Sequence, residues 1–130
     1  MTGKRSKVVF ISSPYAGNTQ ANIDFARQAC FYAICLGYTP IAPHLIYPGI
    51  IPDDDPAWRQ VGLEMSCELL GLCDELWVCG PCATAGMQVE VDHAKDLGLW
   101  IRRVNCEEVA KGVASLEKVA IDARLKALQS

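Results

Sequence analysis

Two groups of residues between Asp74 and Glu90 have the types and spacings that two different chemistries require. Cys79-Gly-Pro-Cys82 has the spacing of a thioredoxin-type motif, in which a following helix stabilises the first thiolate and the second sulfur resolves a mixed disulfide. Gly86-Met-Gln-Val-Glu90 places a carboxylate one helical turn after a glycine. The first pattern indicates a disulfide oxidoreductase. The second indicates a positioned carboxylate that could act as a nucleophile.

The surroundings of the cysteine pair do not fit redox chemistry. A thioredoxin carries its motif in the first half of the chain, followed by a proline-bearing loop that faces the disulfide and by a terminal β-hairpin. Here no proline follows Pro81, and Val78 separates Trp77 from Cys79. We therefore interpret Cys79-Gly-Pro-Cys82 as a turn of small residues that lets a ligand approach the backbone.

Glu90 has the position that a glycosyl-transferring nucleophile needs. The partial positive charge at the start of a helix favours an ionised carboxylate. Such a carboxylate attacks the anomeric carbon as the base departs and forms a covalent glycosyl-enzyme intermediate. Spacing alone leaves open the alternative that Glu90 only complements the helix dipole.

Strand and helix patterns alternate along the chain and must position these residues. Apolar runs predict strands at Lys7–Ser12, Tyr38–Ala42, Glu75–Cys79 and Leu99–Val104. Helical spacing predicts a helix from Asn18 or Thr19 to Gly37, one after Pro56, and others at Gly86–Leu97 and Glu107–Leu128. The helix after Pro56 has one apolar side, made of Trp58, Val61, Met65, Leu69 and Leu72.

This alternation predicts crossover connections and therefore a parallel sheet. We expect one domain over residues 1–130, an α/β fold with a three-layer, doubly wound parallel sheet of at least four strands, flavodoxin-like or Rossmann-like. Ligands of such sheets bind beyond the carboxyl ends of the strands. Ser12–Asn18, Pro43–Asp55 and Gly80–Glu90 should meet there, and His44 is the better placed of the two histidines.

Bulk properties narrow the partners and the compartment. The chain has 130 residues, of which 51% are hydrophobic, and its net charge is −3. That charge gives no electrostatic reason to expect nucleic acid or an anionic membrane as a partner. The apolar run Val8–Ile11 is too short for a signal peptide or a membrane span. Seven cysteines without such a signal indicate a reducing compartment, so we expect a cytoplasmic protein.

The chain resembles the nucleoside 2-deoxyribosyltransferase-like superfamily, especially its small bacterial and phage members, and is similar to 2′-deoxynucleoside 5′-phosphate N-hydrolases. The resemblance covers residues 7–104 and rests on four segments: Val9-Phe-Ile-Ser-Ser-Pro-Tyr15, Ile41-Ala-Pro-His44, Cys73-Asp-Glu-Leu-Trp-Val78 and Gly86–Glu90. It implies that Glu90 is the nucleophile and that His44 borders the pocket. It implies that the first loop holds sugar and base, through Ser12, Ser13, Tyr15 and Gly17. It also implies that no cofactor or metal is needed and that the protein forms a homo-oligomer.

Two positions depart from or vary within the superfamily pattern. Members commonly carry an Asp eight residues before the one matching Asp74, and it helps to protonate the departing base; this chain has Ser66 there. Four residues are candidates to replace that acid: Asp54, Asp55, Glu68 and His44. Six residues before the nucleophile, nucleotide-cleaving hydrolases have a Ser that contacts the 5′-phosphate, and this chain has Thr84. A hydroxyl at a helix start suits a phosphate.

The sequence therefore predicts cleavage or transfer of the N-glycosidic bond of a small-molecule (deoxy)nucleoside or nucleoside 5′-monophosphate. Glu90 is the expected catalytic residue, with Ser66, Thr84 and Gly86 among the substrate-binding residues. Three alternatives stay open: a nucleotide-binding sensor without turnover, a phosphoribohydrolase of the lysine-decarboxylase-like type, and a thioredoxin-like oxidoreductase.

Overall fold

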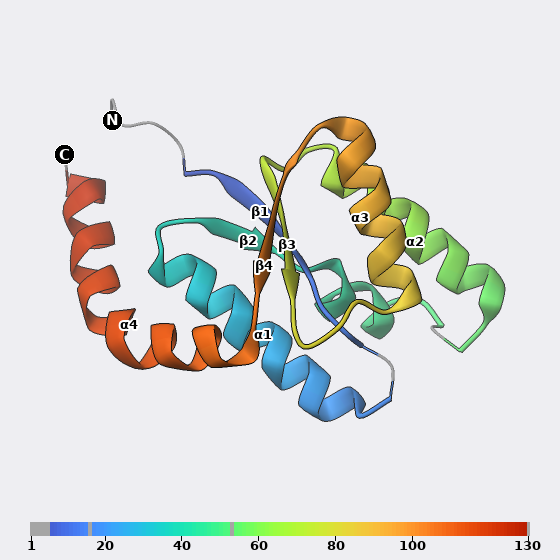
Figure 1. The fold of residues 1–130 in the computed structure, drawn as a ribbon, viewed down its shortest axis with the longest axis horizontal. Helices are drawn as coiled ribbons and strands as arrows, with labels where there is room; N and C mark the ends of the chain where they lie inside the picture. Colours follow the sequence, from blue (N-terminus) through green and yellow to red (C-terminus); the bar gives the residue numbers. More distant parts are fainter. Residues whose placement is uncertain (1–5, 16, 53, 130) are drawn as a thin grey trace.

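The fold is a parallel sheet between two layers of helices (Figure 1). The computed structural model describes residues 6–15, 17–52 and 54–129. Within these ranges the sheet has the strand order β2-β1-β3-β4, and every neighbouring pair is parallel. The strands are β1 (Val8–Ser12), β2 (Thr39–Ile41), β3 (Glu75–Cys79) and β4 (Trp100–Val104). The main helices are α1 (Thr19–Cys35), α2 (Pro56–Leu70), α3 (Ala85–Leu97) and α4 (Cys106–Gln129). The predicted fold class is confirmed.

Alternating side chains of the two central strands supply both cores. Trp77 and Cys79 of β3 face one core, and Leu76 and Val78 face the other. All five residues of β3 are buried. Successive strand residues point to opposite faces of a sheet, so a central strand covered on both sides is continuously apolar.

The helices divide evenly between the two faces. α1 and α4 pack on one face through Ala29, Ala33 and Val109, whereas α2 and α3 cover the other, and Figure 1 shows the two pairs on opposite sides of the sheet. A glycine permits the close approach of α4 to α1, because a Cβ at Gly112 would lie 2.1 Å from Tyr32 Cε1. None of the helices in the described part of the chain is both long and apolar enough to span a bilayer.

Local signals in the sequence fix where the helices begin. Asn18 accepts a hydrogen bond from the Ala21 amide at 3.4 Å and caps α1. Asp55 accepts from the Ala57 amide at 2.8 Å and caps α2. A side-chain acceptor at the N-cap satisfies an amide that has no partner within the helix.

The segment between β2 and α2 contains 3-10 turns at Pro43–Leu45 and Tyr47–Gly49. One detail of the sequence prediction, the apolar side of α2, is wrong. Three of the five residues expected on the apolar side of α2 are exposed, namely Trp58, Val61 and Leu72. The buried side chains of α2 are instead Ser66 and Leu70. The helix is rotated relative to that expectation because its first turns border a cavity rather than the core.

The strand order defines where a ligand should bind. From β1 the chain crosses to β2 on one side and later returns to β3 on the other, so the direction of winding reverses between β1 and β3. Open α/β sheets bind ligands at the carboxyl ends of the strands beside such a reversal. Ser12 ends β1 at this point, and Cys79 ends β3.

Candidate active site

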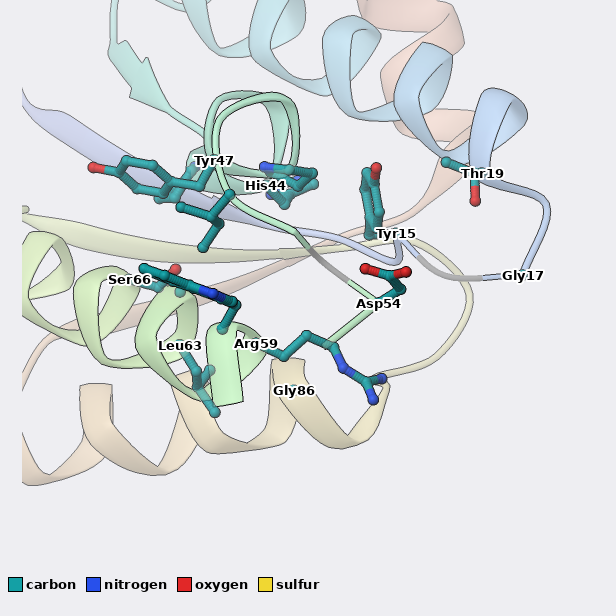
Figure 2. Close-up of a pocket in the computed structure, with 15 residues that line it drawn as sticks. Tyr15, Gly17, Thr19, His44, Tyr47, Asp54, Arg59, Leu63, Ser66 and Gly86 are labelled. Carbon is teal, nitrogen blue, oxygen red and sulfur yellow. The ribbon is translucent and has the colours of Figure 1, made fainter. Parts of the chain in front are cut away.

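A cavity of about 520 Å³ lies beyond the carboxyl ends of the strands (Figure 2). Its walls come from the segment after β1, the turns after β2, the first half of α2 and the start of α3. Three aromatic side chains line it, those of Tyr15, Tyr47 and Trp58. A volume of this size with mostly apolar walls is typical of a small-molecule site.

Glu90 pairs with Ser12 beside this cavity. Ser12 Oγ donates a hydrogen bond to Glu90 Oε1 at 2.7 Å and joins the end of β1 to α3. Glu90 is not a lining residue, but it lies one turn of α3 beyond Gly86, which is. Ser12 is buried and does not line the cavity either. The pair therefore lies next to the α3 side of the cavity and outside its lining.

The electrostatics of Glu90 leave it poised between protonation states. Burial raises the pKa of Glu90 to about 7, and the hydrogen bond from Ser12 opposes that rise. Oε2 makes no hydrogen bond to another described residue. No fully buried side-chain oxygen or nitrogen in the described part of the chain lacks a partner, so Oε2 is reached by solvent. One oxygen is thus held, and the other is available to a substrate.

A second polar pair joins the loop after β1 to the turn after β2. Ser13 Oγ and His44 Nε2 are 2.6 Å apart. Ser13 is buried outside the cavity lining, and His44 lines the cavity. Burial lowers the pKa of His44 to about 4, so its imidazole is neutral at pH 7. A neutral imidazole offers one donor and one acceptor, and its bond to Ser13 decides which nitrogen faces the ligand.

Ser66 is the position at which the sequence resemblance led us to expect an acid. Ser66 is buried and lines the cavity from α2. Of its candidate replacements, Asp55 is used as the cap of α2, and Glu68 is exposed on α2 away from the cavity. Asp54 and His44 line the cavity. Of the four candidates, only these two border the cavity.

Thr84, like Ser12 and Ser13, does not line the cavity, whereas Tyr15, Gly17 and Gly86 do. Thr84 Oγ1 accepts a hydrogen bond from the Met87 amide at 3.3 Å and caps α3. Its side chain has a local structural role.

The cysteine pair is built unlike a redox motif. Cys79 is buried at the end of β3, and burial raises the pKa of its thiol to about 12. Cys82 is exposed, and α3 begins only at Ala85, so neither thiol lies at the helix start that would stabilise a thiolate. We find no cluster of three or more potential metal ligands in the described part of the chain.

The expected ligand approach at this turn is wrong. No residue from Cys79 to Cys82 lines the cavity. A Cβ at Gly80 would lie 3.3 Å from Pro14 Cδ and 3.5 Å from Phe25 Cε2. The glycine, with φ +114°, permits a close approach of protein to protein rather than of protein to ligand.

Sequence reasoning missed Arg59 and the role of Trp58 as cavity residues. Trp58, Gly62 and Ser66 follow one another at intervals of four on α2, and all three line the cavity. Small residues on the same side of a helix as an aromatic residue indicate open space rather than tight packing. This pattern in the sequence could have predicted that α2 forms a wall of the cavity.

The comparisons with known proteins agree with the architecture. A solved structure of a 2-deoxyribosyltransferase from Bacillus psychrosaccharolyticus, described as a biocatalyst for nucleoside synthesis, is similar to this chain. The TM-score is 0.59 at 17% sequence identity, covering 75% of this chain and 72% of that one. This likeness shows the shared fold. No curated protein matches the sequence. The family model that matches residues 7–104 is described as a domain of unknown function, and the chain belongs to that family, DUF7768.

Proposed function

We propose that this protein cleaves or transfers the N-glycosidic bond of a (deoxy)nucleoside or nucleoside 5′-monophosphate, with Glu90 as the nucleophile. The hydrogen bond from Ser12 Oγ to Glu90 Oε1 carries this proposal. It fixes the carboxylate at the end of β1 and leaves Oε2 free to attack. The fold shared with a 2-deoxyribosyltransferase supports the same class of reaction.

The proposed reaction has two displacements at one carbon. Glu90 Oε2 attacks C1′ of the sugar, and the bond from C1′ to the base nitrogen breaks, with its electron pair leaving on the base. Water, or a second base, then attacks C1′ and releases the carboxylate. A pKa of about 7 leaves a substantial ionised fraction at neutral pH, and only that fraction attacks.

The cavity supplies the surroundings that the base requires. Tyr15, Tyr47 and Trp58 offer apolar rings against which a flat heterocycle can stack. The neutral imidazole of His44 can hydrogen-bond to a base edge without an ionic charge. These contacts hold the base while its bond to C1′ breaks.

The departing base needs a proton, and two cavity residues are candidates for its delivery. Asp54 is a carboxyl group in the lining, and His44 is a neutral imidazole fixed by Ser13. A neutral imidazole gives up a proton far less readily than an imidazolium. We therefore propose that Asp54 takes up a proton from solvent and passes it to the departing base, in the role of the acid that Ser66 replaces.

One experiment tests the proposal. The protein is incubated with ribo- and deoxynucleosides and their 5′-monophosphates, and free base is followed by chromatography beside Glu90→Ala. Base release by the wild type that Glu90→Ala abolishes is the expected result. Release that survives the substitution contradicts the nucleophile assignment. Saturable binding without release indicates the sensor.

The assembly state is a separate proposal. We propose a homo-oligomer that works without a cofactor or metal. Sedimentation of the purified protein and base release in the presence of a chelator test these two points. A monomer with full activity contradicts the first, and activity that the chelator abolishes contradicts the second.

A further inference from the structure

One positive charge borders an otherwise mostly apolar cavity. Arg59 is the one lysine or arginine among the described residues that line the cavity. It lies in the first turns of α2, where it is exposed. No ion pair of Arg59 occurs within the described ranges. The neighbouring imidazole, His44, is neutral at pH 7 because burial lowers its pKa to about 4.

The direction of the arginine matters more than its presence. Figure 2 shows the guanidinium of Arg59 turned away from the carboxylate of Asp54, toward Gly86 at the start of α3, while the Asp54 carboxylate lies near Tyr15. The space beside Gly86 is open, since a Cβ there would have no heavy atom within 4 Å. Arg59 and Gly86 therefore both border the α3 side of the cavity.

That side is also the side of the proposed nucleophile. Gly86 and Glu90 are one helical turn apart on α3. A nucleoside whose C1′ reaches Glu90 Oε2 and whose base stacks on the aromatic walls would occupy this cavity. Arg59 lines the same cavity as Gly86, so we place the 5′ substituent on the side that Arg59 borders.

An arginine is well suited to an oxyanion in this position. Its planar guanidinium donates two parallel hydrogen bonds to phosphate oxygens, and these charge-assisted bonds are stronger than neutral ones. A free nucleoside offers only a 5′-hydroxyl at the same place and gains little from the cation. The charge of Arg59 therefore favours nucleoside 5′-monophosphates over free nucleosides, whereas contacts to the base and the sugar are the same for both.

We propose that Arg59 binds the 5′-phosphate of a nucleoside 5′-monophosphate, so that the site selects nucleotides over free nucleosides. The inference rests on the proposed function for the identity of the ligand. The expected phosphate contact is then made by Arg59 of α2 and not by the Thr84 hydroxyl, which caps α3.

Binding to a variant without turnover tests this selection. Glu90→Gln protein is titrated calorimetrically with the four 2′-deoxynucleoside 5′-monophosphates and the four matching nucleosides. At least one monophosphate should bind about tenfold or more tightly than its nucleoside. Adding Arg59→Leu should remove that advantage, whereas Arg59→Lys should keep part of it. Arg27→Leu is the matched control, because Arg27 is exposed on α1 outside the cavity lining.

The outcomes separate this inference from the proposed function. Equal binding of nucleotide and nucleoside, or an advantage that survives Arg59→Leu, overturns the role of Arg59, and base release by the wild type still decides the proposed function. An advantage that Arg59→Leu abolishes, without base release from any compound, supports the phosphate site and contradicts the reaction. Failure of all eight compounds to bind also overturns the role of Arg59, while base release by the wild type from the ribo- and deoxy-compounds decides the proposed function. The nucleotide advantage should also shrink in high salt, because salt screens the charge pair.

Discussion

Two glutamates lie at opposite ends of the same sheet, and their partners differ. Glu75 begins β3 and is 6% exposed. Its Oε1 accepts a hydrogen bond from Trp77 Nε1 at 3.0 Å, and its Oε2 faces Lys7 Nζ at 3.4 Å. Glu90 lies at the carboxyl end of the strands and has one neutral donor, Ser12 Oγ, at 2.7 Å.

The difference distinguishes a carboxylate that holds the fold from one available for chemistry. Both oxygens of Glu75 are engaged, one of them by a cation, so attack on a substrate would first require these contacts to break. Glu90 is partly buried without a cation, which raises its pKa to about 7, and one of its oxygens has no protein partner among the described residues. Under the proposed function, this incomplete satisfaction of a partly buried carboxylate marks the end of the sheet where the reaction takes place.

Replacing each of the two glutamates by glutamine, one at a time, gives the strongest test of their different roles. Glu90→Gln should lower kcat/KM for base release by at least about 10³-fold, because an amide is a poor nucleophile. Glu75→Gln should stay within about threefold of wild type per folded molecule, since its amide oxygen still accepts from Trp77 Nε1. Chromatographic base release, corrected for the folded fraction by circular dichroism, measures both. Equal losses in the two variants would contradict the division of roles.

Glu90 should also contribute to the pH dependence of stability. Its folded-state pKa is about 7 against an ordinary value of 4.5, so folded Glu90 binds more protons than unfolded Glu90 between these pH values. The Glu90 contribution to the free energy of unfolding should then fall by about 3 kcal/mol as pH rises from 4.5 to about 7. His44, with its pKa lowered to about 4, contributes a change of opposite sign, so the difference between wild type and a Glu90 variant isolates the Glu90 effect.

Urea unfolding of wild type and Glu90→Gln across this range measures the effect. The two curves should converge at low pH and separate as pH rises, with the variant more stable at pH 8. Glu117→Gln is the control for net charge, because Glu117 is exposed on α4. Parallel curves for wild type and Glu90→Gln would show that burial of Glu90 carries no such cost.

At the other end of the sheet the expected effect is on stability alone. Glu75→Leu leaves the buried Trp77 Nε1 without an acceptor and should cost about 2 kcal/mol of the free energy of unfolding. Lys7→Met removes only the ion pair to a largely exposed lysine, whose side chain is 65% exposed, and should cost less than about 1 kcal/mol. Denaturant titration of both variants separates the buried hydrogen bond from the surface pair. A larger loss for Lys7→Met would reverse that assignment.

The sequence was sufficient for the sheet and for bringing Glu90 near the first strand. Strand parity and crossover rules predict the parallel order of segments, and segments at the carboxyl ends of parallel strands must be neighbours. Ser12 and Glu90 meet for this reason. The sequence did not predict that Thr84 is used as a helix cap, because a hydroxyl at a helix start suits a cap and a ligand equally well.

The orientation of α2 was the other point that the sequence could not decide. Helical periodicity determines which residues share a side, but not how the helix is turned about its axis against its neighbours. The sequence therefore did not distinguish Trp58 and Arg59 from ordinary surface or core residues, and only the structure shows that both line the cavity.

The smallest expected effect concerns the one donor that Glu90 has. Ser12→Ala removes a hydrogen bond that favours the charged form, so the pKa of Glu90 should rise further above its ordinary value. At pH 7 fewer molecules would then carry an ionised nucleophile, and kcat/KM should fall about three- to tenfold and recover in part at higher pH. Ser13→Ala is the matched control, because Ser13 pairs with His44 and does not contact Glu90. If both serine variants shift the alkaline rise of the pH–rate profile equally, then Ser12 does not act specifically through its hydrogen bond to Glu90. The difference in partners between Glu75 and Glu90 would then not explain why Glu90 is the reactive carboxylate.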